Sequence, residues 1–158
     1  AQASIKAAAL MELPYGAALA GTVDGAFLAL AGGGFVHRRH AESPPADRFV
    51  AAALFMGAPY LWGGRTPDGV DCSGLVQAAL AAEGVALKRD TDQQLQQGEA
   101  VDFAARQCGD LVFFPGHVGL LTAPDTLLHA NAHWMSVVEE PLADVVARGA
   151  AIAGVRRL

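Results

Sequence analysis

Three residues of this chain have the types and spacing that nucleophilic catalysis requires: Cys72, His117 and His129. Cys72 follows a loop rich in glycine and proline and precedes an apolar helical pattern, so we expect it at a helix N-terminus. The unpaired N–H groups and partial positive charge of a helix N-terminus stabilise a thiolate and can bind an oxyanion. The sequence therefore predicts a nucleophilic thiol at Cys72.

The two histidines supply the other groups that such a thiol needs. An imidazole beside the thiol lowers its pKa by forming a thiolate–imidazolium pair, and a third polar group orients the ring. His117 opens a strand-like segment directly after Pro115-Gly116, which suits an exposed base. His129 lies in the next strand-like segment, so a hairpin places the two rings side by side. Asn131, on the same face of that strand, is a competing orienting residue.

The elements expected to position these residues are helices first and antiparallel strands after. Apolar spacing predicts helices over 46–57 and 72–83, then a short helical turn over 92–97. Strands are predicted over 111–114, 118–121, 126–130, 136–139 and 151–155. This order is typical of an α+β domain.

The residues before Pro44-Pro45 follow a different pattern, of short strands over 17–22, 26–30 and 35–37 with turn residues between them. Strands this few and this short do not form an independently stable sheet without a neighbour. We therefore expect a small β-rich unit over residues 1–43 and the main domain over residues 44–158.

The composition argues against several classes of function. Apolar residues make up 53% of the 158, enough to bury a core, and the net charge of −5 disfavours a nucleic-acid partner. The chain contains no apolar run near the roughly 20 residues that a transmembrane helix needs, and no signal peptide is visible. The first residue is alanine, which suggests a processed or trimmed chain.

Two cysteines are too few for a disulfide framework, although one bridge between Cys72 and Cys108 is an alternative. We interpret Cys72 as a free thiol and Cys108 as a small apolar residue packed just before a strand. A zinc site made of Cys72, His117 and His129 matches no zinc spacing. We therefore expect no metal and no other cofactor.

Longer motifs resemble the NlpC/P60 family of cell-wall cysteine peptidases over about residues 47–158. These motifs are Gly57-Ala58-Pro59-Tyr60-Leu61-Trp62-Gly63-Gly64, Gly69-Val70-Asp71-Cys72-Ser73-Gly74-Leu75-Val76-Gln77, Arg89-Asp90 with Gln93-Gln94, Gly109-Asp110-Leu111-Val112-Phe113-Phe114, His117-Val118-Gly119-Leu120 and Leu128-His129-Ala130. The N-terminal part is similar to the second half of a bacterial SH3-like domain, on Leu13-Pro14-Tyr15-Gly16-Ala17 and the segment from Gly25 to Val36. The resemblance implies a papain-like α+β fold, helices packed on an antiparallel sheet, preceded by a partial SH3-like β-barrel.

The resemblance also implies roles for the residues already singled out. Cys72 is the nucleophile, His117 the general base and then acid, and His129 the residue that orients His117. Asp71 and Ser73 are expected to hold the free amine of the substrate's N-terminal L-Ala, and Tyr60 is expected in the wall beside Cys72. For Asp71 the simpler interpretation is a helix cap.

The reaction implied is hydrolysis of the γ-D-glutamyl–diamino acid bond of peptidoglycan stem peptides or muropeptides through a thioester. Such an enzyme belongs in the cell envelope, or in the cytoplasm if it recycles free peptides. Two alternatives stay open: a papain-like amidase or acyltransferase acting on another substrate, and a catalytically inactive cell-wall-binding module.

Overall fold

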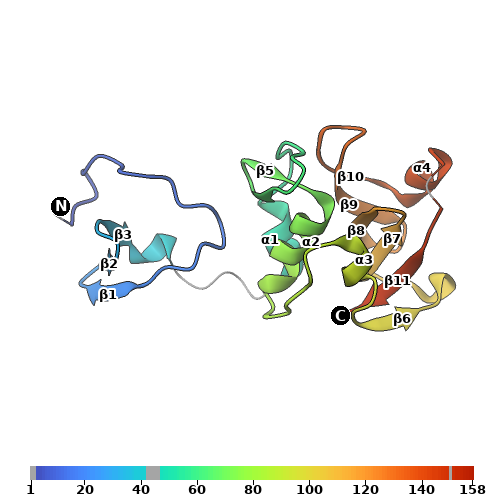
Figure 1. Ribbon diagram of the computed structural model, residues 1–158, viewed down its shortest axis with the longest axis horizontal. Helices are drawn as coiled ribbons and strands as arrows, with labels where there is room; N and C mark the ends of the chain where they lie inside the picture. Colours follow the sequence, from blue (N-terminus) through green and yellow to red (C-terminus); the bar gives the residue numbers. More distant parts are fainter. Residues whose placement is uncertain (1–2, 42–46, 150) are drawn as a thin grey trace. The chain divides into compact units, whose positions relative to one another are not determined.

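The chain divides into two compact units, residues 1–44 and 45–158. The computed structural model describes residues 3–41, 47–149 and 151–158 (Figure 1). The expected break at Pro44-Pro45, the boundary between residues 43 and 44 and the expected helix start at residue 46 lie outside the described residues.

The first unit contains one small antiparallel sheet. Its strands are β1 (Gly21–Asp24), β2 (Phe27–Leu30) and β3 (Phe35–His37), in the order β1-β2-β3, followed by a 3₁₀ turn over Arg38–His40. The Phe27 ring packs edge-on against Phe35, yet all described residues of this unit are at least partly exposed. The second and third predicted strands match β2 and β3, whereas the first, predicted over 17–22, begins four residues later as β1. The sheet is open, so a barrel and an SH3-like identity stay predictions.

The second unit is built on a six-stranded antiparallel sheet with the order β10-β9-β8-β7-β11-β6 (Figure 1). The strands are β6 (Glu99–Val101), β7 (Leu111–Phe114), β8 (His117–Ala123), β9 (Thr126–Asn131), β10 (Ser136–Pro141) and β11 (Gly154–Arg157). A two-stranded hairpin, β4 (Arg65–Thr66) and β5 (Gly69–Val70), precedes the sheet in the chain. The α+β prediction of helices on an antiparallel sheet is therefore confirmed.

The helices of the second unit are α1 (Arg48–Ala53), α2 (Cys72–Ala81), α3 (Thr91–Gln94) and α4 (Leu142–Ala147), with a 3₁₀ turn over Phe103–Ala105. Helix α4 packs against the sheet in one apolar cluster, formed by Val112, Phe114, Leu121, Leu127, Leu142, Val145 and Val155. Burying these side chains supplies the hydrophobic stabilisation that fixes α4 on the strands.

Helix α2 begins at Cys72 for local reasons. The Asp71 side chain accepts the backbone N–H of Gly74 at 2.7 Å, which caps the helix. A Cβ atom at Gly74 would lie 2.4 Å from the carbonyl oxygen of Gly64, so glycine lets the preceding loop approach the helix start. These two contacts hold Cys72 at the helix end, where the sequence placed it.

Several elements differ from the predictions, and among them α2 ends at Ala81 instead of residue 83 and α3 covers Thr91–Gln94 instead of 92–97. Helix α1 ends at Ala53 instead of residue 57, because the chain turns there and the Gly57 N–H bonds to Val137 O. The final strand starts at Gly154, three residues later than predicted, and pairs with both β7 and β6. Strand β6 and helix α4 were not predicted, since short segments carry weak periodic signals.

Among the described residues, no helix combines the length and hydrophobicity needed to cross a bilayer.

Candidate active site

The thiol of Cys72 lies at the start of α2, where it is 5% exposed. The backbone N–H groups of Val118, Ser73 and Cys72 itself face the sulfur. Because Val118 directly follows His117 at the start of β8, the thiol and the first predicted histidine are brought to the same place. Both cysteines are free thiols, as predicted for Cys72.

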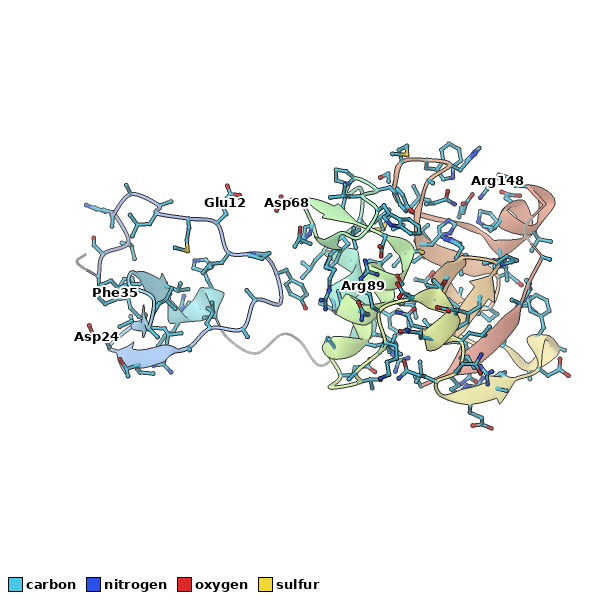
Figure 2. All side chains as sticks on the ribbon, viewed as in Figure 1. Glu12, Asp24, Phe35, Asp68, Arg89 and Arg148 are labelled. Carbon is cyan, nitrogen blue, oxygen red and sulfur yellow. The ribbon has the colours of Figure 1, made fainter. Side chains whose placement is uncertain are left out.

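Asp71 is buried and its carboxylate already has several partners. It accepts the N–H of Gly63 at 2.8 Å and that of Gly74 at 2.7 Å, and it pairs at 2.5 Å with Arg89, which is labelled in Figure 2. Burial raises the pKa of the Asp71 carboxyl, but the bonds from Arg89, Gly74 and Gly63 outweigh it and hold that pKa below its usual value. The ionised Asp71 carboxylate therefore connects three parts of the site: the loop at Gly63, the first turn of α2 and the Arg89 side chain.

The other two residues expected near the substrate also lie around this helix start. Ser73 is buried, and its hydroxyl accepts from Arg89 at 2.6 Å and lies 3.2 Å from Asp71 Oδ1. Burial raises the pKa of the Tyr60 phenol, and negative charge on the nearby Cys72 and Asp71 side chains raises it further. Tyr60, Asp71, Cys72 and Ser73 thus form one cluster.

His117 and His129 meet through their rings, as the predicted hairpin requires. His117 Nε2 lies 2.7 Å from His129 Nδ1, with ring centroids 4.9 Å apart. The opposite nitrogen of His129, Nε2, lies 2.7 Å from Glu140 Oε1 and 3.2 Å from Asn131 Nδ2. Asn131 therefore contacts His129 through the nitrogen that does not face His117.

Glu140 was not predicted as a site residue. It lies on β10 and is held by Arg148, which follows α4 and donates to both carboxylate oxygens at 2.5 and 2.8 Å (Figure 2). Trp134 Nε1 donates to the same carboxylate at 3.3 Å. Burial raises the pKa of Glu140, but the bonds from Arg148, His129 and Trp134 outweigh it and set that pKa at about 2.

The protonation states differ from the predicted thiolate–imidazolium pair. Burial, followed by the neighbouring His129, lowers the pKa of His117 to about 4. Burial also raises the pKa of the Cys72 thiol. The N–H of Val118, which faces the sulfur, lowers this pKa, but by less than burial raises it. The predicted lowering of the thiol pKa is opposite to this net direction, and both shifts favour a neutral thiol and a neutral imidazole in the resting site.

Alkylation of Cys72 by iodoacetamide is accordingly expected to accelerate continuously as the pH rises from 5 to 9. The reason is that the thiolate is the reactive species and its fraction grows with pH below the raised thiol pKa. The measurement is the rate of mass labelling in a Cys108→Ser background, which leaves one thiol to follow. A rate that is level between pH 5 and 8 would instead show an ion pair at rest.

Cys108 is exposed, so its prediction as a packed apolar residue is wrong. Its thiol lies 3.1 Å from the carbonyl oxygen of Thr122, a polar contact at the surface before β7.

No group of three or more His, Cys, Asp or Glu side chains within the described ranges is arranged to hold a metal ion.

Comparisons with known proteins agree with this geometry. Residues 57–148 match the NlpC/P60 family. Among curated proteins, the gamma-D-glutamyl-L-lysine dipeptidyl-peptidase of Bacillus subtilis is 36% identical over 92 residues, which cover 53% of this chain and 31% of that protein. Dipeptidyl-peptidase 6 of Lysinibacillus sphaericus is 39% identical over 89 residues, covering 54% of this chain and 32% of that protein. This chain spans about a third of the length of these relatives.

Solved structures show the same similarity. An NlpC/P60 family protein from Bacillus cereus ATCC 10987 has a TM-score of 0.73 at 27% identity, covering 88% of this chain and 52% of that chain. The peptidoglycan hydrolase RipB of Mycobacterium tuberculosis has a TM-score of 0.61 at 31% identity, covering 76% of this chain and 65% of that chain.

Proposed function

Because the chain belongs to the NlpC/P60 family, we propose that it is a cysteine peptidase that hydrolyses the γ-D-glutamyl–diamino acid bond of peptidoglycan stem peptides. The observation that carries the proposal is the chain of contacts from His117 through His129 to Glu140, beside the Cys72 thiol. The curated relatives named for dipeptidyl-peptidase activity, one of them on gamma-D-glutamyl-L-lysine, favour this bond.

The first half of the proposed reaction forms a thioester. As the Cys72 sulfur attacks the γ-glutamyl carbonyl carbon, His117 accepts the thiol proton, so no resting ion pair is needed. The oxyanion is stabilised by the Cys72 backbone N–H at the start of α2. The carbon–nitrogen bond then breaks, and His117 returns the proton to the leaving amine of the diamino acid.

The second half releases the γ-glutamyl product. Water attacks the thioester carbonyl while His117 accepts its proton, and the carbon–sulfur bond breaks. The proton returns from His117 to the sulfur, which restores the neutral thiol. This sequence consumes one water and requires no oxidant, metal or other cofactor.

For substrate binding we propose Tyr60, Ser73 and Asp71, with Tyr60 in the wall beside the thiol. An ammonium at Asp71 has to share the carboxylate with Arg89, which contacts it at 2.5 Å. Asp71 therefore has two candidate roles, binding the L-Ala amine and holding the helix start, and a variant described in the Discussion separates them.

Residues 44–158 form the proposed catalytic domain, and residues 1–43 a partial SH3-like domain. We place the enzyme in the cell envelope, where stem peptides are part of the wall, or in the cytoplasm if it recycles free peptides.

The test is incubation with L-Ala-γ-D-Glu-L-Lys and with the matching meso-diaminopimelate tripeptide, followed by mass spectrometry. We expect release of L-Ala-γ-D-Glu from at least one of them. The N-acetylated tripeptides serve as matched substrates, and their slower cleavage is expected if the free amine is recognised. Release of other fragments, or hydrolysis of an acyl ester in place of these peptides, would rule out the proposed bond.

A further inference from the structure

We propose that Glu140, held by Arg148, is a positioning residue that sets the order of protons along His129 and His117. In this order the carboxylate accepts a hydrogen bond from the Nε2–H of His129, and His117 is left with an unprotonated Nδ1 that faces the thiol. The inference rests on the proposed function only in taking Cys72 and His117 as the reacting pair.

The order follows from the ionised carboxylate. Glu140 accepts hydrogen bonds and, with a pKa of about 2, donates none at neutral pH. Its oxygen lies 2.7 Å from His129 Nε2, so that nitrogen carries the proton. A neutral imidazole has one N–H, which leaves His129 Nδ1 as an acceptor.

The same reasoning passes to the next ring. His129 Nδ1 lies 2.7 Å from His117 Nε2, so His117 must donate from Nε2. Its remaining nitrogen, Nδ1, is then unprotonated and can accept the proton of Cys72. The partly buried carboxylate also favours the positive charge that His117 gains in the reaction, because the Glu140 charge raises the pKa of His117.

Asn131 is the competitor for His129. Its Nδ2 amide donates hydrogen bonds and lies 3.2 Å from His129 Nε2, so it favours a bare Nε2. Turning this amide over would break the bond in which its Oδ1 accepts the N–H of His133 at 2.5 Å. The charged and shorter bond to Glu140 dominates, because hydrogen bonds to ionised groups are about twice as strong as neutral ones. Without Glu140, Asn131 becomes the controlling partner.

This competition predicts opposite tautomers for two variants. Glu140→Gln keeps an oxygen that can accept from Nε2, but it removes the charge. Glu140→Leu fills a similar volume without any acceptor, so Asn131 donates to a bare Nε2 and His129 carries its proton on Nδ1. His117 then accepts at Nε2 and presents a protonated Nδ1, which cannot take the proton of Cys72.

The experiment is ¹⁵N-histidine NMR at pH 7.5 on the full chain, combined with iodoacetamide labelling of Cys72 in the Cys108→Ser background. The parent and Glu140→Gln are expected to show His129 protonated on Nε2, and Glu140→Leu to show it protonated on Nδ1. Peptide cleavage is expected to lose kcat by about tenfold in Glu140→Gln and by about a hundredfold or more in Glu140→Leu, with little change in KM. Labelling of Cys72 is expected to accelerate in Glu140→Leu, because the Nδ1–H that His117 then presents donates to the thiolate and raises its fraction.

The matched controls are Glu139→Gln and Glu139→Leu. Glu139 is the exposed neighbour on β10 and accepts from Thr122 Oγ1, so these changes remove the same charge on the opposite face of the strand. They should leave the tautomer and the labelling rate unchanged.

An unaltered Nε2 proton and labelling rate in a folded Glu140→Leu variant would overturn the proposal. If that variant does not fold, Glu140→Gln decides: a kcat equal to that of the parent, or a His129 proton on Nδ1, overturns the proposal, and the tenfold loss of kcat with the proton kept on Nε2 supports it. The tautomer and the labelling rate are independent of the peptide substrate, so failure of the parent to cleave stem peptides would contradict the proposed function alone.

Discussion

Replacing Cys72 by serine is expected to lower kcat for stem-peptide cleavage by at least about a thousandfold, with little change in KM. The hydroxyl is a much weaker acid than the thiol, so transfer of its proton to His117 is far less favourable and the attacking oxygen is less reactive. Binding contacts of the substrate are preserved because serine is close to cysteine in size. The measurement is initial-rate kinetics on the tripeptide that the parent enzyme cleaves.

The chain offers a matched control for this variant. Cys108→Ser makes the same chemical change at the exposed cysteine, whose thiol contacts the Thr122 carbonyl. We expect kcat and KM to equal those of the parent. Equal losses in the two variants would contradict the assignment of Cys72 as nucleophile, as would full activity of Cys72→Ser.

Replacing Asp71 by alanine is expected to destabilise the second unit by about 3 kcal/mol, which lowers its Tm by about 10 °C. The variant loses the cap of α2, worth about 1 kcal/mol. It also loses charged hydrogen bonds from Arg89, whose share we reduce to about 2 kcal/mol because that side chain is 30% exposed and regains water. Thermal unfolding followed by circular dichroism measures this change.

The controls for Asp71 distinguish its two candidate roles. Asp68→Ala removes the same group from an exposed position between β4 and β5 and should leave the Tm unchanged (Figure 2). Arg89→Ala combined with Asp71→Ala should destabilise less than the sum of the two single changes, because they share one ion pair. A parent-like Tm with only a raised KM in Asp71→Ala would instead identify amine binding as the main role of Asp71.

Much of the site could be predicted from the sequence, because its signals are local. The glycine-rich loop followed by an apolar helical pattern located Cys72 at the start of α2. Pro115-Gly116 marked the turn before His117, and the predicted strand over 111–114 has the bounds of β7. In each case a few neighbouring residues decide the backbone, so no long-range information is needed.

The missing parts depend on contacts between distant residues. Glu140 appears in the sequence as one more charged residue of a strand, and only the β9–β10 register, with Val138 opposite His129, brings its side chain to the ring. Arg89 belongs to a recognised motif, yet its pairing with Asp71 crosses the whole of α2. Burial explains why the pKa shifts of Cys72 and His117 differ from the predicted thiolate–imidazolium pair. Desolvation of these two side chains follows from packing and not from residue type.

The proposed nucleophile and its proposed proton-transfer partners come from two separate stretches of chain, around residues 60–89 and 117–148. During synthesis the first stretch leaves the ribosome before the second. Cys72 therefore has neither its base nor the Val118 amide until β8, β9, β10 and Arg148 have also emerged. A nascent or truncated chain that ends before Arg148 carries the thiol without the complete set of contacts from His117 to Arg148, so the proposed activity requires the whole stretch up to Arg148.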